Sequence, residues 1–123
     1  MGQTIPRVFD QWVEDTTGPT LRIRLDSPAW FAWLEASTTR RFAYPLFDRR
    51  VGYIVGVMTV RKEPRQRGGW YWSVYRRAGA GMQKVYLGRS AAVTQARLAA
   101  IAANLLAEAG RQAADSTPET PPR

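Results

Sequence analysis

The sequence predicts an α+β domain in which a three-stranded antiparallel sheet, or one of four to five strands, is backed by a C-terminal helix, with a further short helix in the N-terminal part. Two observations predict this class. Residues 57–88 read as three short strands in series, joined by the turn-forming runs PRQRGG and AGAG. Residues 90–109 then carry apolar side chains at helical spacing. A chain of 123 residues has room for one modest core.

The first twenty residues are weakly patterned. Val8, Phe9, Trp12 and Val13 have near-helical spacing, so we expect residues 1–20 to form a short helix or an arm. Residues 21–25 alternate apolar and basic side chains, as in a half-buried strand.

A helix is expected to begin after Ser27, whose side chain can cap it, with Pro28 in the first turn. Trp30, Trp33 and Leu34 then form one apolar stripe, and core packing is the preferred role for these tryptophans. Residues 40–47 alternate loosely up to a proline that indicates an edge position or a bulge, and residues 51–60 are rich in β-branched side chains.

The AGAG turn fixes the register of the last two strands. It places Tyr75 opposite Lys84 and Ser73 opposite Tyr86 on one face. On the other face Val74 meets Val85 and Trp72 meets Leu87. Adding the preceding strand with Met58 and Val60 inward gives an outer face of Thr59, Arg61, Tyr71, Ser73, Tyr75, Arg77, Lys84 and Tyr86.

The last helix, over residues 90–109, is expected to be capped by Ser90 or Thr94 and to end at Gly110. Its apolar stripe is the natural cover for the inner face of the sheet. From residue 111 the composition turns to Asp, Ser, Thr and Pro. The predicted organisation is therefore an arm or short helix over residues 1–20, one domain over 21–110 and a disordered tail over 111–123.

The charge of the chain is concentrated in the strand region. The formal net charge is +8, and residues 40–89 hold twelve basic residues against Asp48 and Glu63 alone. Such clustering is typical of a protein with a polyanionic partner, although a solvated basic surface in an arginine-rich composition is the alternative.

Several classes of chemistry lack support in the sequence. The chain contains no cysteine and no histidine, and the run from Arg65 to Gly69 is too short to hold a nucleotide. We therefore expect no catalytic residues, no metal and no cofactor. The absence of a long apolar run or a signal pattern favours a cytoplasmic protein with no membrane partner.

The runs WFAWLE, VRKE, YWSVYRR, KVYLG and TQARLAAIA, spread over residues 30–106, resemble a short module of bacterial, especially Chloroflexi-type, proteins. In some of those proteins the module stands near the start of large ATP-dependent, maltose-activator-like transcriptional regulators. No settled biochemical activity comes with this resemblance.

The order strand–strand–strand–helix is more loosely similar to the arm-type domain of tyrosine integrases and to the plant ethylene-response-factor domain. Both lay a three-stranded sheet in the major groove of DNA. The run Lys84-Val85-Tyr86-Leu87-Gly88 matches the third strand of the plant domain, and this resemblance implies DNA contacts for Lys84 and Tyr86. The second strand departs from that pattern, because Tyr75 and Arg77 stand where the plant domain presents a glutamate and an arginine.

The sequence therefore predicts binding to duplex DNA, as a transcriptional regulator or a mobile-element accessory factor. Central contacts are assigned to Arg61, Tyr75, Arg77, Lys84 and Tyr86. Phosphate contacts are assigned to Arg65, Arg67, Arg76 and Arg89. Two alternatives stay open: binding of RNA or single strands by stacking on tyrosines, and a protein-interaction module for an acidic partner. Homodimer formation is also open.

Overall fold

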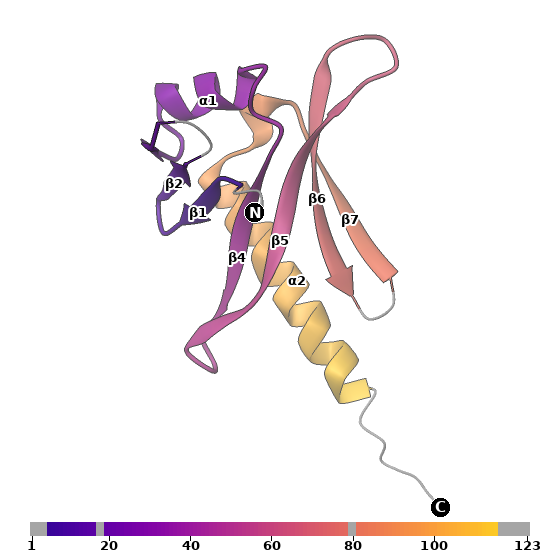
Figure 1. Ribbon diagram of the computed structural model, residues 1–123. Coiled ribbons are helices and arrows are strands. Elements are labelled where there is room, and N and C mark those ends of the chain that lie inside the picture. Colours follow the sequence, from indigo (N-terminus) through magenta and orange to yellow (C-terminus); the bar gives the residue numbers. More distant parts are fainter. Residues whose placement is uncertain (1–4, 17–18, 79–80, 116–123) are drawn as a thin grey trace, which may run out of the picture.

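A mixed β-sheet organises the molecule (Figure 1). The computed structural model describes residues 5–16, 19–78 and 81–115, and within them the sheet has seven strands in the order β3-β2-β1-β4-β5-β6-β7. The strands are β1 (Arg7–Phe9), β2 (Trp12–Asp15), β3 (Leu21–Arg24), β4 (Arg41–Asp48), β5 (Tyr53–Pro64), β6 (Trp70–Ala78) and β7 (Gly81–Gly88). The helices are α1 (Pro28–Glu35), the 3-10 turn η1 (Ser90–Ala92) and α2 (Gln95–Asp115).

The predicted sheet of three, or four to five, antiparallel strands is wrong in both size and direction. Seven strands pair, and β1 runs parallel to β4, with Arg7 beside Ala43. The α+β class itself stands.

The strands that the sequence analysis did not predict are β1 and β2, which lie in the N-terminal segment. Val8 and Val13 face each other across a hairpin whose turn is Asp10-Gln11, and both valines are buried. Asp10 adopts φ 59, a left-handed conformation that aspartate tolerates better than most residues. Val8, Phe9, Trp12 and Val13 lie on the two strands of this hairpin, and their spacing along the chain resembles that of a helix. For this reason residues 1–20 were expected to form a short helix or an arm.

The predicted hairpin register is confirmed over most of its length. Tyr75 pairs with Lys84, Ser73 with Tyr86 and Val74 with Val85. Trp72 pairs with Gly88 rather than with Leu87, because a bulge inserts one extra residue into β7.

The start of α1 is as predicted. The Ser27 side chain accepts a hydrogen bond from the Trp30 amide at 3.2 Å, and Pro28 follows it. Trp30, Trp33 and Leu34 are all buried, which confirms the apolar stripe.

The C-terminal helix begins and ends later than the predicted residues 90–109, and of its two predicted caps the structure has Thr94. Ser90 lies in η1, and Thr94 caps α2 by accepting a bond from the Arg97 amide at 3.2 Å. The helix continues through Gly110 to Asp115 instead of ending there, because an internal glycine lowers helix stability by only about 1 kcal/mol. Residues 111–115, expected to be disordered, are thus helical, and residues 116–123 lie outside the described part. Among the described residues, no helix combines the length and apolar character that crossing a membrane requires.

The core lies between the sheet and the two helices, with α2 running along one face (Figure 1). Phe42 of β4 contacts the rings of Trp30 and Trp72, at centroid distances of 5.5 and 5.7 Å. The Trp72 indole N–H donates to Ser90 Oγ at 3.0 Å, and the Ser90 hydroxyl donates to the Glu35 carboxylate. This relay joins β6, η1 and α1 at the top of the core.

We expect Ser90→Ala to lower the free energy of unfolding by about 1–3 kcal/mol, because the buried Trp72 N–H would lose its acceptor. Urea denaturation measures this loss. The matched control is Ser37→Ala, at an exposed position, which should change stability by less than about 0.5 kcal/mol. Equal effects of the two substitutions would contradict a stabilising relay.

Candidate nucleic-acid interface

The hairpin of β5 and β6 is longer than the strands on either side of it. Its ladder extends from Thr59–Tyr75 to Pro64–Trp70. On one side β4 begins at Arg41, which pairs with Arg61, and on the other side β7 ends at Gly88, which pairs with Trp72. Residues 63–71 therefore form a two-stranded ribbon that projects beyond the rest of the sheet (Figure 1). We call this segment the free ribbon.

The tip of the free ribbon is a tight turn with two exposed arginines. The amide of Gly68 donates to the Arg65 carbonyl at 3.2 Å, and the amide of Arg65 donates to the Gly69 carbonyl at 3.1 Å. Gly68 and Gly69 adopt φ 93 and 81, so the backbone conformation itself selects glycine there. Arg65 and Arg67 are both exposed beside this turn.

An open concavity of about 1060 Å³ lies at the base of the ribbon, beside the end of β7. We call it the ribbon concavity. It combines cationic and aromatic side chains with one carboxylate, and its walls include Glu35, Arg65, Arg67, Trp70, Tyr71, Lys84, Tyr86 and Arg89. Gly88, with φ 118, turns the chain between Leu87 and Arg89 at this point.

The arginines of the ribbon concavity keep their charge uncompensated. Within the described residues, Arg65, Arg67 and Arg89 form no ion pair. Arg89 follows directly after β7, whereas Arg65 and Arg67 come from the ribbon tip. Three guanidinium groups from two separate segments thus meet around one hollow, which is an arrangement suited to an anionic ligand.

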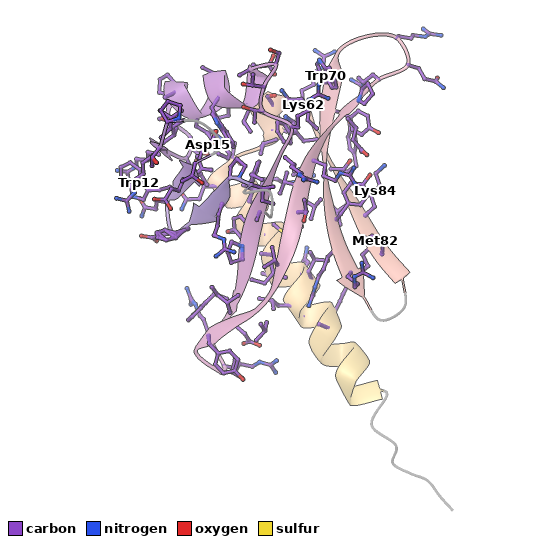
Figure 2. All side chains as sticks on the ribbon, viewed as in Figure 1. Trp12, Asp15, Lys62, Trp70, Met82 and Lys84 are labelled. Atoms are coloured by element: carbon purple, nitrogen blue, oxygen red, sulfur yellow. The ribbon has the colours of Figure 1, made fainter. Side chains whose placement is uncertain are left out.

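The aromatic walls are accessible. Tyr71 and Tyr86 contact each other with ring centroids 5.5 Å apart, and Tyr86 is 52% exposed. Trp70 is 47% exposed and lies close to Lys62 near the base of the ribbon (Figure 2), with the ammonium group 5.9 Å from its ring. These rings offer flat surfaces on which a base can stack.

A network on the outer face of the sheet holds one half-buried carboxylate. Glu63 accepts a hydrogen bond from the Tyr75 hydroxyl, and its Oε1 lies 3.4 Å from Lys84 Nζ. Burial acts to raise the pKa of Glu63, but the hydrogen bond from Tyr75 and the charge of Lys84 outweigh it, so the pKa lies below its ordinary value. Lys84 is therefore partly neutralised, unlike the three arginines.

The structure brings four predicted contact residues together on the outer face. Arg61 pairs with Ser73, which pairs with Tyr86, and Tyr75 pairs with Lys84 one row away. The Arg61 guanidinium lies over the Tyr75 ring, 5.1 Å from its centroid. The predicted grouping of these side chains is confirmed, and their contact with DNA stays a prediction.

Two other predicted contact residues lie elsewhere. Arg76 points to the helix side, where its Nη1 donates to the Leu105 carbonyl at 3.0 Å. It was assigned to phosphate contact together with Arg65, Arg67 and Arg89, yet alternation along β6 puts it on the face opposite to that of Tyr75 and Arg77. Arg77 is exposed near the far end of β6 and pairs with Met82, which Figure 2 shows well below Lys84 on β7.

Part of the exposed surface is apolar rather than basic. Around the β4–β5 turn and on the end of β7, large apolar side chains are 42–62% exposed, and they are Phe47, Val51, Tyr53, Ile54, Val55, Val57 and Met82. The predicted basic and aromatic character therefore belongs to the end of the sheet nearest the free ribbon.

Sequence reasoning overlooked Trp70 and the role of Glu63. The signal for Trp70 was present in the hairpin register, which extends the β5–β6 pairing beyond the end of β7 and leaves this position without a cover. Glu63 was counted only as a charge, although its position opposite Tyr71 places it on the outer face. Among the described residues, no group of three or more acidic side chains is arranged to hold a metal ion.

Comparison with protein-family models, curated proteins and solved structures found no match for this chain. The resemblances to the bacterial module and to the two DNA-binding domains therefore remain predictions.

We expect Glu63→Gln to lower the stability of the protein at pH 7 by about 1–2 kcal/mol, because it weakens hydrogen bonds to a charged group. A carboxyl with a lowered pKa stabilises the fold while it is ionised. The difference between wild type and variant should therefore shrink as the pH falls from 7 to about 3. Urea titrations at both pH values measure it. Glu14→Gln, at an exposed position, is the control, and a loss that is independent of pH would contradict the network.

Proposed function

We propose that this protein binds duplex DNA, with the free ribbon lying in the major groove and the outer face of the sheet turned toward the duplex. The observation that carries the proposal is the projecting ribbon with its uncompensated arginines. A two-stranded β-ribbon is narrow enough to enter the major groove, and the ribbon of residues 63–71 is not widened by β4 or β7.

The charges fit this placement. Arg65 and Arg67 at the tip, with Arg89 beside the end of β7, are positioned to contact phosphate oxygens on one side of the groove. Arginine forms bidentate hydrogen bonds with phosphate, and each neutralised phosphate releases counterions. The ribbon concavity would therefore contribute affinity for DNA that does not depend on the base sequence of the DNA.

The side chains between the arginines are candidates for contact with bases. Gln66 lies at the tip, and glutamine can bind adenine through two hydrogen bonds. Tyr71 and Tyr86 also line the ribbon concavity. A role in transcription regulation or as an accessory factor of a mobile element is consistent with such a binding protein, and no catalytic step is assigned to it.

A second candidate function is binding of single-stranded nucleic acid. The observation that favours it is the exposure of Trp70 and Tyr86 on the walls of one basic concavity. Stacking on aromatic rings contributes about 1–3 kcal/mol per base in single-strand binders. Duplex binding is preferred because the ribbon projects as a narrow ridge beside the concavity.

The test is fluorescence anisotropy with equal lengths of duplex DNA, single-stranded DNA and duplex RNA over a series of salt concentrations. We expect duplex DNA to bind most tightly, with affinity falling steeply as salt rises. The double variant Arg65→Gln, Arg67→Gln should reduce the slope of log affinity against log salt by about two, since each phosphate contact contributes about 0.9.

The matched control is Arg49→Gln, Arg97→Gln. It removes the same charge from exposed positions on the β4–β5 turn and on α2. If both double variants change the slope equally, the ribbon is not the binding element. Tightest binding to single strands, abolished by Trp70→Ala, would favour the second candidate instead.

A further inference from the structure

A second basic concavity, of about 640 Å³, lies on the opposite side of β5 from the ribbon concavity. We call it the β4 concavity because Arg40 and Arg41 come from the start of β4. Its walls include Asp15, Thr39, Arg40, Arg41, Arg61 and Lys62. Of the ten residues that line it, four are cationic and one is acidic, so the hollow has a net positive charge.

The pairing of strands places like charges directly opposite each other at this concavity. Arg41 and Arg61 are direct cross-strand partners in the β4–β5 ladder. The ladder therefore brings two guanidinium-bearing residues side by side at the concavity.

The surroundings of the β4 concavity reduce its positive potential only in part. Asp15 is the acidic residue of the lining, and it accepts a hydrogen bond from the Trp33 indole N–H at 3.0 Å. Lys62 Nζ donates a hydrogen bond to the Ala36 carbonyl at 2.9 Å. Because a carbonyl group is uncharged, this bond does not neutralise the ammonium group. Burial lowers the pKa of Lys62. The negative charge of Glu35 raises that pKa in part, and the positive charge of Arg40 lowers it further.

The two concavities lie on either side of the base of the free ribbon. Arg61 and Lys62 of β5 line the β4 concavity, whereas Pro64 and Arg65, slightly further along the same strand, line the ribbon concavity. The row Arg61–Ser73–Tyr86 crosses from one to the other. Ser73 is fully buried and its hydroxyl has no hydrogen-bond partner within the described residues, so the surface between the concavities is formed by the larger side chains beside it.

We propose that the β4 concavity is a second phosphate-binding site, contacting the sugar–phosphate backbone on the side of the groove opposite Arg65, Arg67 and Arg89. This inference rests on the proposed function, since it assumes that the ribbon lies in the groove of a duplex. The guanidinium groups of Arg40 and Arg61 bind phosphate oxygens. Arg61, which the sequence analysis assigned to the central contacts, would then contact the sugar–phosphate backbone of the DNA.

The experiment compares two double variants of the full chain by the same anisotropy assay on random-sequence duplex DNA. Arg40→Gln, Arg61→Gln should reduce the salt slope by about two, as Arg65→Gln, Arg67→Gln does from the other side. Combining all four substitutions should reduce the slope by about four, because the two sites contact different phosphates. Arg40→Gln alone should reduce the salt slope by about one. Because Arg40 is exposed, this single variant controls for a loss of binding that is caused by unfolding.

The outcomes separate the two proposals. If wild type binds and the ribbon variant weakens binding, but Arg40→Gln, Arg61→Gln behaves like Arg49→Gln, Arg97→Gln, the second site is refuted and the proposed function stands. If the four-residue variant loses no more than either double variant, both clusters contact the same phosphates and the two-sided arrangement is wrong. If wild type binds no nucleic acid at low salt, both proposals fail.

Discussion

The arrangement of the molecule depends on the hydrogen bond between the Trp72 indole and Ser90, which in turn donates to Glu35. This relay fixes η1, and with it the start of α2, against the inner face of the sheet. A second tryptophan makes a similar contact on the same segment, because the Trp30 indole N–H donates to the Val93 carbonyl at 2.8 Å. Aromatic packing and these buried polar contacts together direct both helices to one face. Neither helix covers the opposite face of the sheet or the free ribbon.

The outer surface is arranged by charge rather than by packing. One carboxylate, Glu63, partly neutralises Lys84, while Arg65 and Arg67 at the ribbon tip form no ion pair within the described residues. A stretch with twelve basic residues therefore does not give a uniformly positive sheet. It gives two basic hollows beside one projecting hairpin, with apolar side chains at the far end of the surface. Such a division matches a ligand that carries charge along two parallel lines, as duplex DNA does.

Local signals predicted much of the central sheet and of α1. The AGAG turn and the alternation of side chains were sufficient to place Tyr75 opposite Lys84 and to bury Trp72. Non-local features were missed. The parallel pairing of β1 with β4 joins segments more than thirty residues apart, as the pair Arg7–Ala43 shows, and nothing near either segment specifies it. The concavities were missed for the same reason, since each depends on where a neighbouring strand ends. Arg76 was expected to contact phosphate, but its guanidinium group donates to the Leu105 carbonyl of α2 on the helix side of the sheet.

The central claim is that the free ribbon and the hollows beside it form the binding surface. Nuclear magnetic resonance titration of the isotope-labelled protein with a short duplex tests it most directly, because each backbone amide reports separately. The account predicts that chemical-shift changes concentrate at residues 63–71, with further changes near Arg40, Arg61 and Arg89. Changes confined to the apolar β4–β5 turn, or spread along α2, would contradict it.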